Sequence, residues 1–246
     1  MSEAVREDAV ILETRALEKR FGGVSAIAGV DFALRRGELR CLIGPNGAGK
    51  STFFKMLTAQ IRPSKGQVLF DGRDISRAHP HEISRLGIGI KNQVPDVYDG
   101  ITVDENLWLA AHLRHGARAA RAKVDETLER LELGDIRWQL LGALAHGQRQ
   151  WVEFGMVMAL EPEVILLDEP TAGMSIEETN RTAALIREVN RTTTIVVVEH
   201  DMQFIRQIAD IVTVFHQGRI LAEDTMARIQ ANQAVREVYL GTSGLA

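Results

Sequence analysis

The sequence predicts an α/β fold, in which a mostly parallel sheet is layered with helices. In the last third of the chain, short apolar runs at 164–167, 194–198 and 211–215 alternate with stretches of helical pattern. This alternation is typical of parallel strands joined by crossover helices. Earlier, the apolar run at 41–43 enters a glycine-rich loop that is followed by a helical pattern. These observations predict a parallel sheet built around a strand–loop–helix unit.

The first third of the chain predicts an additional antiparallel sheet. Segments with β-type composition occur at 11–17 and 30–34, and a further apolar run at 67–70 leads into Asp71-Gly72. An Asp-Gly pair after a strand favours a tight turn back into a neighbouring strand. The middle differs, because residues 102–133 have a helical pattern that begins with Thr102-Val103-Asp104-Glu105, a capping box. We therefore expect a helical subdomain inserted between the two halves of the core.

Composition indicates an ordinary globular protein. The 246 residues are 45% hydrophobic and 25% charged, with a formal net charge of −4. This balance gives no general attraction to nucleic acid, and no apolar run approaches the ~20 residues of a membrane-spanning helix. Glu3, Glu7 and Asp8 without a long apolar stretch argue against a secretory signal, and a lone Cys41 fits a reducing cytoplasm.

The most informative feature is the glycine-rich loop after residues 41–43. It satisfies every fixed position of the phosphate-binding loop pattern with Gly44, Pro45, Asn46, Gly47, Ala48, Gly49, Lys50, Ser51 and Thr52. The glycines let backbone N–H groups point inward, and a helix beginning near Lys50 adds its positive dipole end. Lys50 is expected to hold the β- and γ-phosphates of a nucleoside triphosphate, and the Ser51 hydroxyl to bind Mg²⁺. A glycine-rich turn that binds nothing is the weaker alternative in this strand–loop–helix context.

A second set of chemical groups stands at the end of the apolar run at 164–167. Asp168 and Glu169 follow it directly, and open α/β sheets bind their ligands at the carboxyl ends of their strands. Adjacent strand residues point to opposite sides, so one carboxylate can face the metal while the other faces water. We assign Asp168 to Mg²⁺ and Glu169 to the attacking water. Taken alone, the pair could be two acids that merely end a strand.

Further segments resemble the nucleotide-binding cassette of ABC transporters, over nearly the whole chain. They are the signature segment Leu144, Ala145, His146, Gly147 and Gln148, together with Gln93, Asp168-Glu169-Pro170-Thr171 and Glu199-His200-Asp201. The resemblance implies a RecA-like core with a single domain over residues 1–246. The core and β subdomain would comprise about 9–93 and 144–246, and the helical subdomain about 94–143.

The resemblance also implies roles and partners. The signature segment would contact ATP bound to a second cassette, so that two cassettes enclose two ATP molecules. Gln93 would reach the Mg²⁺ and water region, His200 the γ-phosphate, and Phe21 would stack on adenine. Each has a simpler alternative: Gln93 as a loop residue, His200 as a structural histidine, and Phe21 as core. The basic run 114–123 is expected to be a solvated helix face rather than an RNA site, because no aromatics interleave with it.

Four positions depart from the family pattern. Ala145 stands where serine is usual, and the lost hydroxyl removes a hydrogen bond to a charged phosphate worth about 1.5–3 kcal/mol. His146 replaces glycine and is a candidate substitute donor. Ser175 stands where aspartate is common, and Asn92 where an aromatic or apolar residue is usual. We expect these changes to affect communication between the two sites more than ATP binding.

Within the family, the sequence is similar to the ATPases of branched-chain amino acid importers, closest to the urea and short-chain amide subgroup. The segments that carry this likeness are 37–41, 146–151, 198–202 and 238–241. The resemblance implies an ATP-hydrolysing subunit that uses ATP and Mg²⁺. It would pair with an identical or different cassette and power uptake of a small polar solute through two integral membrane subunits fed by a solute-binding protein. It would lie on the cytoplasmic face of the cell membrane, with the segment 94–99 beside the coupling helices of the membrane subunits. An exporter ATPase, for instance for lipopolysaccharide, and a soluble non-transport ABC ATPase are the alternatives.

Overall fold

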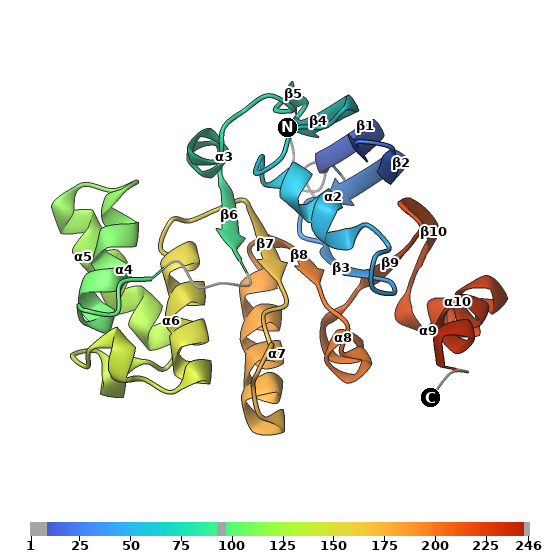
Figure 1. Cartoon of the computed structure of the whole chain (residues 1–246). Coiled ribbons are helices and arrows are strands. Elements are labelled where there is room, and N and C mark those ends of the chain that lie inside the picture. The colour runs from blue at the N-terminus through green and yellow to red at the C-terminus, as the bar shows by residue number, and fades with distance from the viewer. Residues whose placement is uncertain (1–8, 93–96, 244–246) are drawn as a thin grey trace.

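The computed structural model describes residues 9–92 and 97–243 (Figure 1). A six-stranded sheet with the order β10-β9-β3-β8-β7-β6 forms its centre. Its strands are β3 (Leu39–Ile43), β6 (Ile88–Lys91), β7 (Val164–Asp168), β8 (Thr194–Val198), β9 (Ile211–His216) and β10 (Arg219–Asp224). All neighbours pair in parallel except β9 and β10. The three apolar runs predicted as strands are confirmed.

Two strands of this sheet were not predicted, for different reasons. Strand β6 has four residues and contains Gly89, where an added Cβ would lie 2.6 Å from Val157 Cγ1. The glycine therefore serves close packing against a helix, which the local sequence does not reveal. Strand β10 is an edge strand whose residues alternate between exposed and half-buried, and its apolar stretch is only the three residues 220–222 between Arg219 and Glu223.

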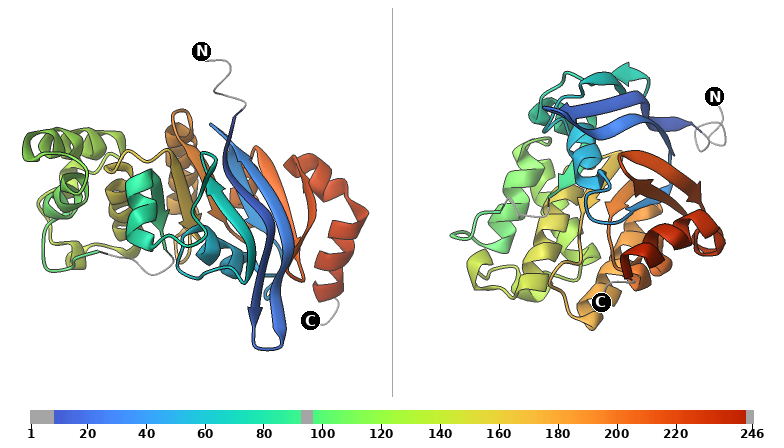
Figure 2. Two further views of the ribbon diagram at one scale, coloured as in Figure 1. Left: turned by 90° about the horizontal axis from the view of Figure 1, so that it is seen from above. Right: turned by 45° about the vertical axis from the view of Figure 1, so that its right-hand side comes forward.

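The predicted antiparallel sheet is confirmed, with the order β2-β1-β4-β5. Its strands are β1 (Val10–Phe21), β2 (Val24–Arg35), β4 (Lys65–Phe70) and β5 (Arg73–Asp74). Strands β1 and β2 are longer than predicted and form a hairpin that projects beyond the rest of the sheet (Figure 2, left). The turn predicted at Asp71-Gly72 connects β4 to β5. This sheet supplies the second β layer.

The helices are α2 (Lys50–Leu57), α3 (Pro80–Leu86), α4 (Val103–His112), α5 (Ala117–Arg130), α6 (His146–Met158), α7 (Ile176–Asn190), α8 (Met202–Ile208), α9 (Met226–Ala231) and α10 (Gln233–Ser243). The predicted start of α2 at Lys50 is confirmed. The helical region 102–133 contains α4 and α5. At its start the Thr102 hydroxyl accepts the Glu105 N–H at 3.2 Å, and the Thr102 N–H donates to the Glu105 carboxylate at 2.8 Å. The predicted capping box is therefore confirmed. No helix among the described residues is long and apolar enough to cross a membrane.

Two hydrophobic clusters cover the two faces of the central sheet. In β3, Leu39, Cys41 and Ile43 belong to one cluster and Leu42 to the other, as the alternation of strand side chains requires. The first cluster extends through α6, α7 and α8 into α4 and α5, which lie on one side of Figure 1. The second fills the space between the sheet, α2 and the antiparallel sheet. Burial raises the pKa of the Cys41 thiol, which keeps this cysteine protonated.

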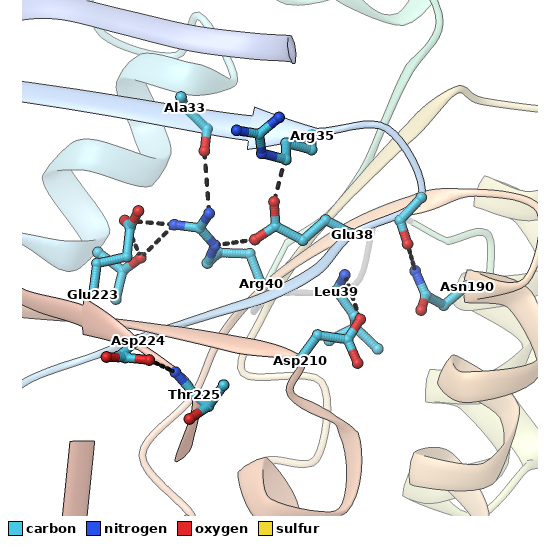
Figure 3. A network of polar contacts seen from close by, with 12 residues as sticks. Ala33, Arg35, Glu38, Leu39, Arg40, Asn190, Asp210, Glu223, Asp224 and Thr225 are labelled. Carbon is cyan, nitrogen blue, oxygen red and sulfur yellow. Dashed lines mark hydrogen bonds and ion pairs between the residues drawn. The ribbon is translucent and has the colours of Figure 1, made fainter. Parts of the chain in front are cut away.

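The buried Arg40 side chain joins the two sheets at the end of β3 opposite the glycine-rich loop (Figure 3). Its guanidinium donates to the Thr213 hydroxyl at 2.9 Å and to the Ala33 carbonyl at 3.1 Å. It also pairs with Glu223 at 2.5 Å and contacts Glu38. These groups come from β2, β9, β10 and the turn before β3, so one side chain fixes the relative position of four segments.

We expect Arg40→Met to destabilise the fold, because the change keeps the chain length but leaves the Glu38 and Glu223 carboxylates without a counter-charge. Breaking such a pair costs about 2–4 kcal/mol when one partner is partly exposed. For a chain of this size this corresponds to a fall in melting temperature of about 5–15 °C. Thermal unfolding of the purified chain measures it. Arg219→Met, at an exposed position, is the control, and a loss no larger than the control's would contradict the assignment.

Candidate nucleotide-binding site

The glycine-rich loop is shaped by close backbone approaches. Gly44 has φ 150°, and a Cβ there would lie 2.3 Å from the Phe215 carbonyl oxygen. Gly49 has φ 107°, and a Cβ there would lie 2.7 Å from the Ala26 carbonyl oxygen. No side chain fits at either position, so the loop can curl tightly between β2 and β9. The start of α2 at Lys50 then aims its free N–H groups at the loop interior.

Lys50 lies over the loop. Its ammonium donates to the Gly44 carbonyl at 2.6 Å and to the Pro45 carbonyl at 3.2 Å. Burial lowers the pKa of Lys50, and the nearby Glu169 and Asp168 carboxylates oppose this by raising it. A half-buried ammonium beside inward-pointing N–H groups is a site for phosphate oxygens.

The sheet brings the predicted groups to one edge. Leu42 and Asp168 both pair with Val198, in neighbouring parallel strands. The loop after β3, the carboxylates after β7 and the residues after β8 therefore emerge side by side. The sequence alone predicted that each lies at a strand end, and the strand order β3-β8-β7 shows that the ends are adjacent.

Asp168, the last residue of β7, is half-buried in surroundings that favour a nearby cation. Burial raises the pKa of its carboxyl, the Glu169 charge raises it further, and Lys55 and Lys91 lower it. A bound cation would relieve this unfavourable burial of charge. Among the described residues, no group of three acidic, histidine or cysteine side chains could hold a metal without further ligands. Mg²⁺ is typically held by one or two protein oxygens with phosphate and water, so Asp168 and Ser51 fit it.

Glu169 has a strained backbone with φ 47°, a conformation that non-glycine residues seldom adopt. The Glu169 N–H donates to the Val198 carbonyl at 2.9 Å, and the Glu169 carbonyl accepts the Ala172 N–H at 3.2 Å. Its carboxylate Oε1 lies 3.6 Å from Nδ1 of His200, whose side chain is 70% exposed. The carboxylate therefore lies beside His200 and close enough to Lys50 to raise the pKa of that lysine.

Glu199 was missed as a functional residue by the sequence analysis. It is 1% exposed, and its carboxylate accepts the Thr171 hydroxyl at 2.5 Å and the His200 N–H at 2.8 Å. Asp201 then caps α8 by accepting the Gln203 N–H at 2.7 Å. Glu199 therefore holds His200 against the segment that follows Glu169. An acid at the end of a continuous apolar strand was the signal that could have indicated it.

Tyr239 in α10 is a second residue that the sequence analysis left without a role. Burial raises the pKa of its phenol to about 12, and a hydrogen bond with the Gly44 backbone partly offsets this effect. The C-terminal helix thus contacts the first residue of the glycine-rich loop. Only the tertiary structure reveals this contact, because 195 positions separate the two residues in the sequence.

Phe21 lies at the end of the β1–β2 hairpin and is 50% exposed. The Lys19 ammonium lies 5.0 Å from its ring centre. The same hairpin brings Ala26 against Gly49, so the exposed ring belongs to the structure that borders the loop. It is not a core residue, and adenine stacking stays a prediction. Gln93 lies outside the described residues, as do residues 94–96 of the segment 94–99.

The signature segment forms the start of α6. Ala145 is the residue before the helix and provides no side-chain cap, while its own N–H donates to the Gln148 side chain at 3.1 Å. Leu144 is buried. A Cβ at Gly147 would lie 2.1 Å from the Glu178 carboxylate, so this glycine permits close packing with α7. The first N–H groups of α6 have no capping side chain, which suits an incoming phosphate.

His146 contacts the post-carboxylate loop (residues 172–175) of its own chain. Its Nε2 lies 3.0 Å from the Ala172 carbonyl oxygen, and a Cβ on Gly173 would lie 3.3 Å from the imidazole ring. In the tautomer that donates to this carbonyl, Nε2 carries the proton, and the Gln150 side-chain nitrogen lies 3.4 Å from the same atom. A neutral ring then has an unprotonated Nδ1, which could donate to a phosphate only after the ring is protonated.

The other two departures from the family pattern have local partners. Ser175 caps α7: its hydroxyl accepts the Glu178 N–H at 3.3 Å, and its N–H donates to the Glu178 carboxylate at 2.8 Å. Serine preserves the capping function that aspartate would have. The side-chain oxygen Oδ1 of Asn92 accepts a hydrogen bond from the Gln60 side-chain amide at 2.8 Å. It ties the end of β6 to the segment after α2.

Comparisons with known proteins agree with this geometry. A family model described as ABC transporter matches residues 27–172, and a second, described as branched-chain amino acid ATP-binding cassette transporter, matches residues 219–244. The high-affinity branched-chain amino acid transport ATP-binding protein BraF of Pseudomonas aeruginosa is 33% identical over 249 residues, covering 94% of this chain and 98% of that protein.

Two solved structures are informative. The ADP conformation of MJ1267, an ATP-binding cassette of an ABC transporter, matches with a TM-score of 0.85 and 27% identity, covering 95% of this chain and 99% of that one. A dimeric post-hydrolysis state of the cassette MJ0796, bound to ADP and Pi, matches with a TM-score of 0.78. At 23% identity, over 88% of this chain and 99% of that one, it shows the fold alone. The glycine-rich loop, the carboxylate strand and the signature helix are those of an ATP hydrolase, and the chain belongs to the ATP-binding subunits of ABC transporters.

Proposed function

We propose that this chain is the ATPase subunit of an ABC importer and that its ATP site is completed by a second cassette. The observation that carries this proposal is the division of the chain's phosphate-binding features between two places. One edge of the sheet holds Lys50, Asp168 and Glu169. The uncapped N-terminus of α6 is a separate anion site at the signature segment, and it would serve ATP bound to the partner.

The chain's own residues then account for hydrolysis. The loop N–H groups and Lys50 would bind the β- and γ-phosphates, and Ser51 and Asp168 would hold Mg²⁺. When bound, Mg²⁺ neutralises charge that develops on the phosphate oxygens. Glu169 accepts the proton of the attacking water, and His200 contacts the γ-phosphate. Gln93 belongs to the same proposal through the family resemblance.

Import is favoured over export by the likeness to BraF, whose name describes branched-chain amino acid transport, and by the match of residues 219–244.

The partners proposed are a second ATPase subunit, identical or different, two integral membrane subunits and, indirectly, a solute-binding protein. The chain would lie on the cytoplasmic face of the membrane. The solute class is a branched-chain amino acid, urea or a short-chain amide. The division of the chain into a core and a helical subdomain at 94–143 is part of the same proposal.

Purification of the native membrane complex through a tag on this chain tests the importer assignment. We expect integral membrane subunits to co-purify and ATP hydrolysis to rise when the solute-binding protein is added with its solute. Parallel assays with leucine, urea and acetamide separate the solute classes. Recovery of ribosomes without membrane proteins would support the soluble alternative, and stimulation by lipopolysaccharide would support the exporter.

The substitute-donor role of His146 gives a separate prediction. His146→Ala removes both the tie to Ala172 and any donation to the partner's phosphate. We expect ATP hydrolysis by the assembled transporter to fall about tenfold, the loss of one charge-assisted hydrogen bond. His112→Ala, at a histidine of α4 that stacks on Trp108, serves as the control. An unchanged rate for the His146 variant would rule out the donor role.

A further inference from the structure

A buried ion pair connects the central sheet to the signature helix. Lys91 is the last residue of β6, and its ammonium lies 3.1 Å from the Glu153 carboxylate of α6. The two side chains are only 2% and 6% exposed. Both charges have therefore been removed from water, which costs several kcal/mol for each ion before their mutual attraction is counted.

The lysine end of this ion pair is poorly satisfied. Within residues 9–92 and 97–243, Lys91 Nζ is buried and has no hydrogen-bond acceptor in good geometry. The Gln150 carbonyl oxygen, one helical turn before Glu153, is also buried without a donor in the same part of the chain. The Lys91 and Gln150 side chains line a small internal cavity between α6, α7 and β7. Replacing a buried ion pair by apolar side chains of similar size is often neutral or stabilising, so the stability of the fold is a weak reason for these charges.

The position of the pair indicates its use. Lys91 pairs with Leu167 in the strand that delivers Asp168 and Glu169. Glu153 lies on the same face of α6 as His146 and Gln150, since their spacings of four and three residues match the helix period. A shift of α6 by one turn would separate the buried Glu153 carboxylate from the buried Lys91 ammonium and so lose their mutual attraction. The pair therefore penalises displacement of the signature helix along the sheet.

We propose that Lys91 and Glu153 are positioning residues that hold the signature helix in register with the carboxylate strand, so that the helix can close the partner's ATP site. This inference rests on the proposed two-cassette site. It assigns the pair to the geometry of that site and not to ATP binding by the glycine-rich loop or to stability of the fold.

The test uses the full chain carrying Glu169→Gln, in which ATP is bound but not hydrolysed. Three variants are compared with this parent: Lys91→Met, Glu153→Leu, and the apolar double variant with both changes. Each single variant leaves one buried charge and should lower the melting temperature by about 5–15 °C. The double variant should melt at or above the temperature of the parent and bind ATP within about twofold of its affinity. Its ATP-driven dimerisation, measured by sedimentation with the parent's partner cassette, should be about tenfold weaker.

A second measurement is independent of dimerisation. Spin labels at Leu113→Cys, after α4, and at Lys65→Cys, on β4, report the distance between the helices and the sheet, because both positions are exposed and Cys41 is buried. The double variant should give a broader distance distribution than the parent. Unchanged distances, or wild-type dimerisation of a stable double variant, would overturn the inference. If the parent itself fails to dimerise while the distribution broadens, the positioning role holds and the two-cassette site is wrong.

Discussion

Glu169→Gln is expected to lower ATP hydrolysis about 10²–10⁴-fold while leaving ATP binding within about twofold of wild type. Glutamine preserves the size of the side chain and its place beside His200, but its amide cannot accept a proton from water. The binding groups at Gly44 and Lys50 are untouched. The variant should therefore accumulate with ATP bound.

Steady-state hydrolysis by the complete transporter and ATP titration of the purified chain measure the two effects. Glu129→Gln, at an exposed position on α5, controls for the loss of a carboxylate and should hydrolyse ATP at the wild-type rate. Persistence of wild-type hydrolysis in Glu169→Gln would mean that another group activates the water.

Lys50→Met is expected to weaken ATP binding about 10–150-fold, because a hydrogen bond to a charged group contributes about 1.5–3 kcal/mol. Hydrolysis should fall below detection, since the same ammonium would neutralise charge on the γ-phosphate. Methionine retains the apolar part of the side chain, so the fold should melt normally. Calorimetric titration with ATP measures the affinity, and Lys65→Met, at an exposed position on β4, is the control.

The wild-type chain should show a related pH dependence. Burial lowers the pKa of Lys50, so the lysine loses its proton at a lower pH than an exposed lysine does. ATP favours the ammonium form, and its affinity should therefore fall with rising pH on the alkaline side before ordinary lysines titrate. Lys50→Met should lack this fall. Identical alkaline profiles for the two proteins would contradict the contact between Lys50 and phosphate.

Much of the fold could be predicted because local signals agreed with the tertiary structure. The helix at 50–57 begins at the predicted residue, and strands β7, β8 and β9 of the parallel sheet are predominantly apolar. Strand β6 could not be predicted, because it has only four residues and shows no distinctive hydrophobic period. Its glycine, Gly89, is required by close packing against α6, which the local sequence does not reveal. The edge strand β10 was missed because its apolar stretch is only three residues long and has charged residues on both sides.

In the site, too, the residues with local sequence signals were predicted and those that depend on tertiary contacts were not. The glycine-rich loop and the carboxylates have fixed local spacings and were predicted by residue. Glu199, Tyr239 and Lys91 were not assigned functions, since each acts through partners distant in the sequence. A lysine such as Lys91 is expected in solvent, and only the packing of α6 on the sheet buries it beside Glu153.

The central claim is that ATP joins two cassettes, each closing the other's site. Sedimentation velocity of the Glu169→Gln chain, alone and mixed with the second cassette of its transporter, tests this most directly. MgATP should convert the 27.3 kDa monomer to a species of about twice that mass in at least one of the two samples. A chain that carries Lys50→Met in addition to Glu169→Gln should not undergo this conversion. A monomer at saturating MgATP in both samples would contradict the claim.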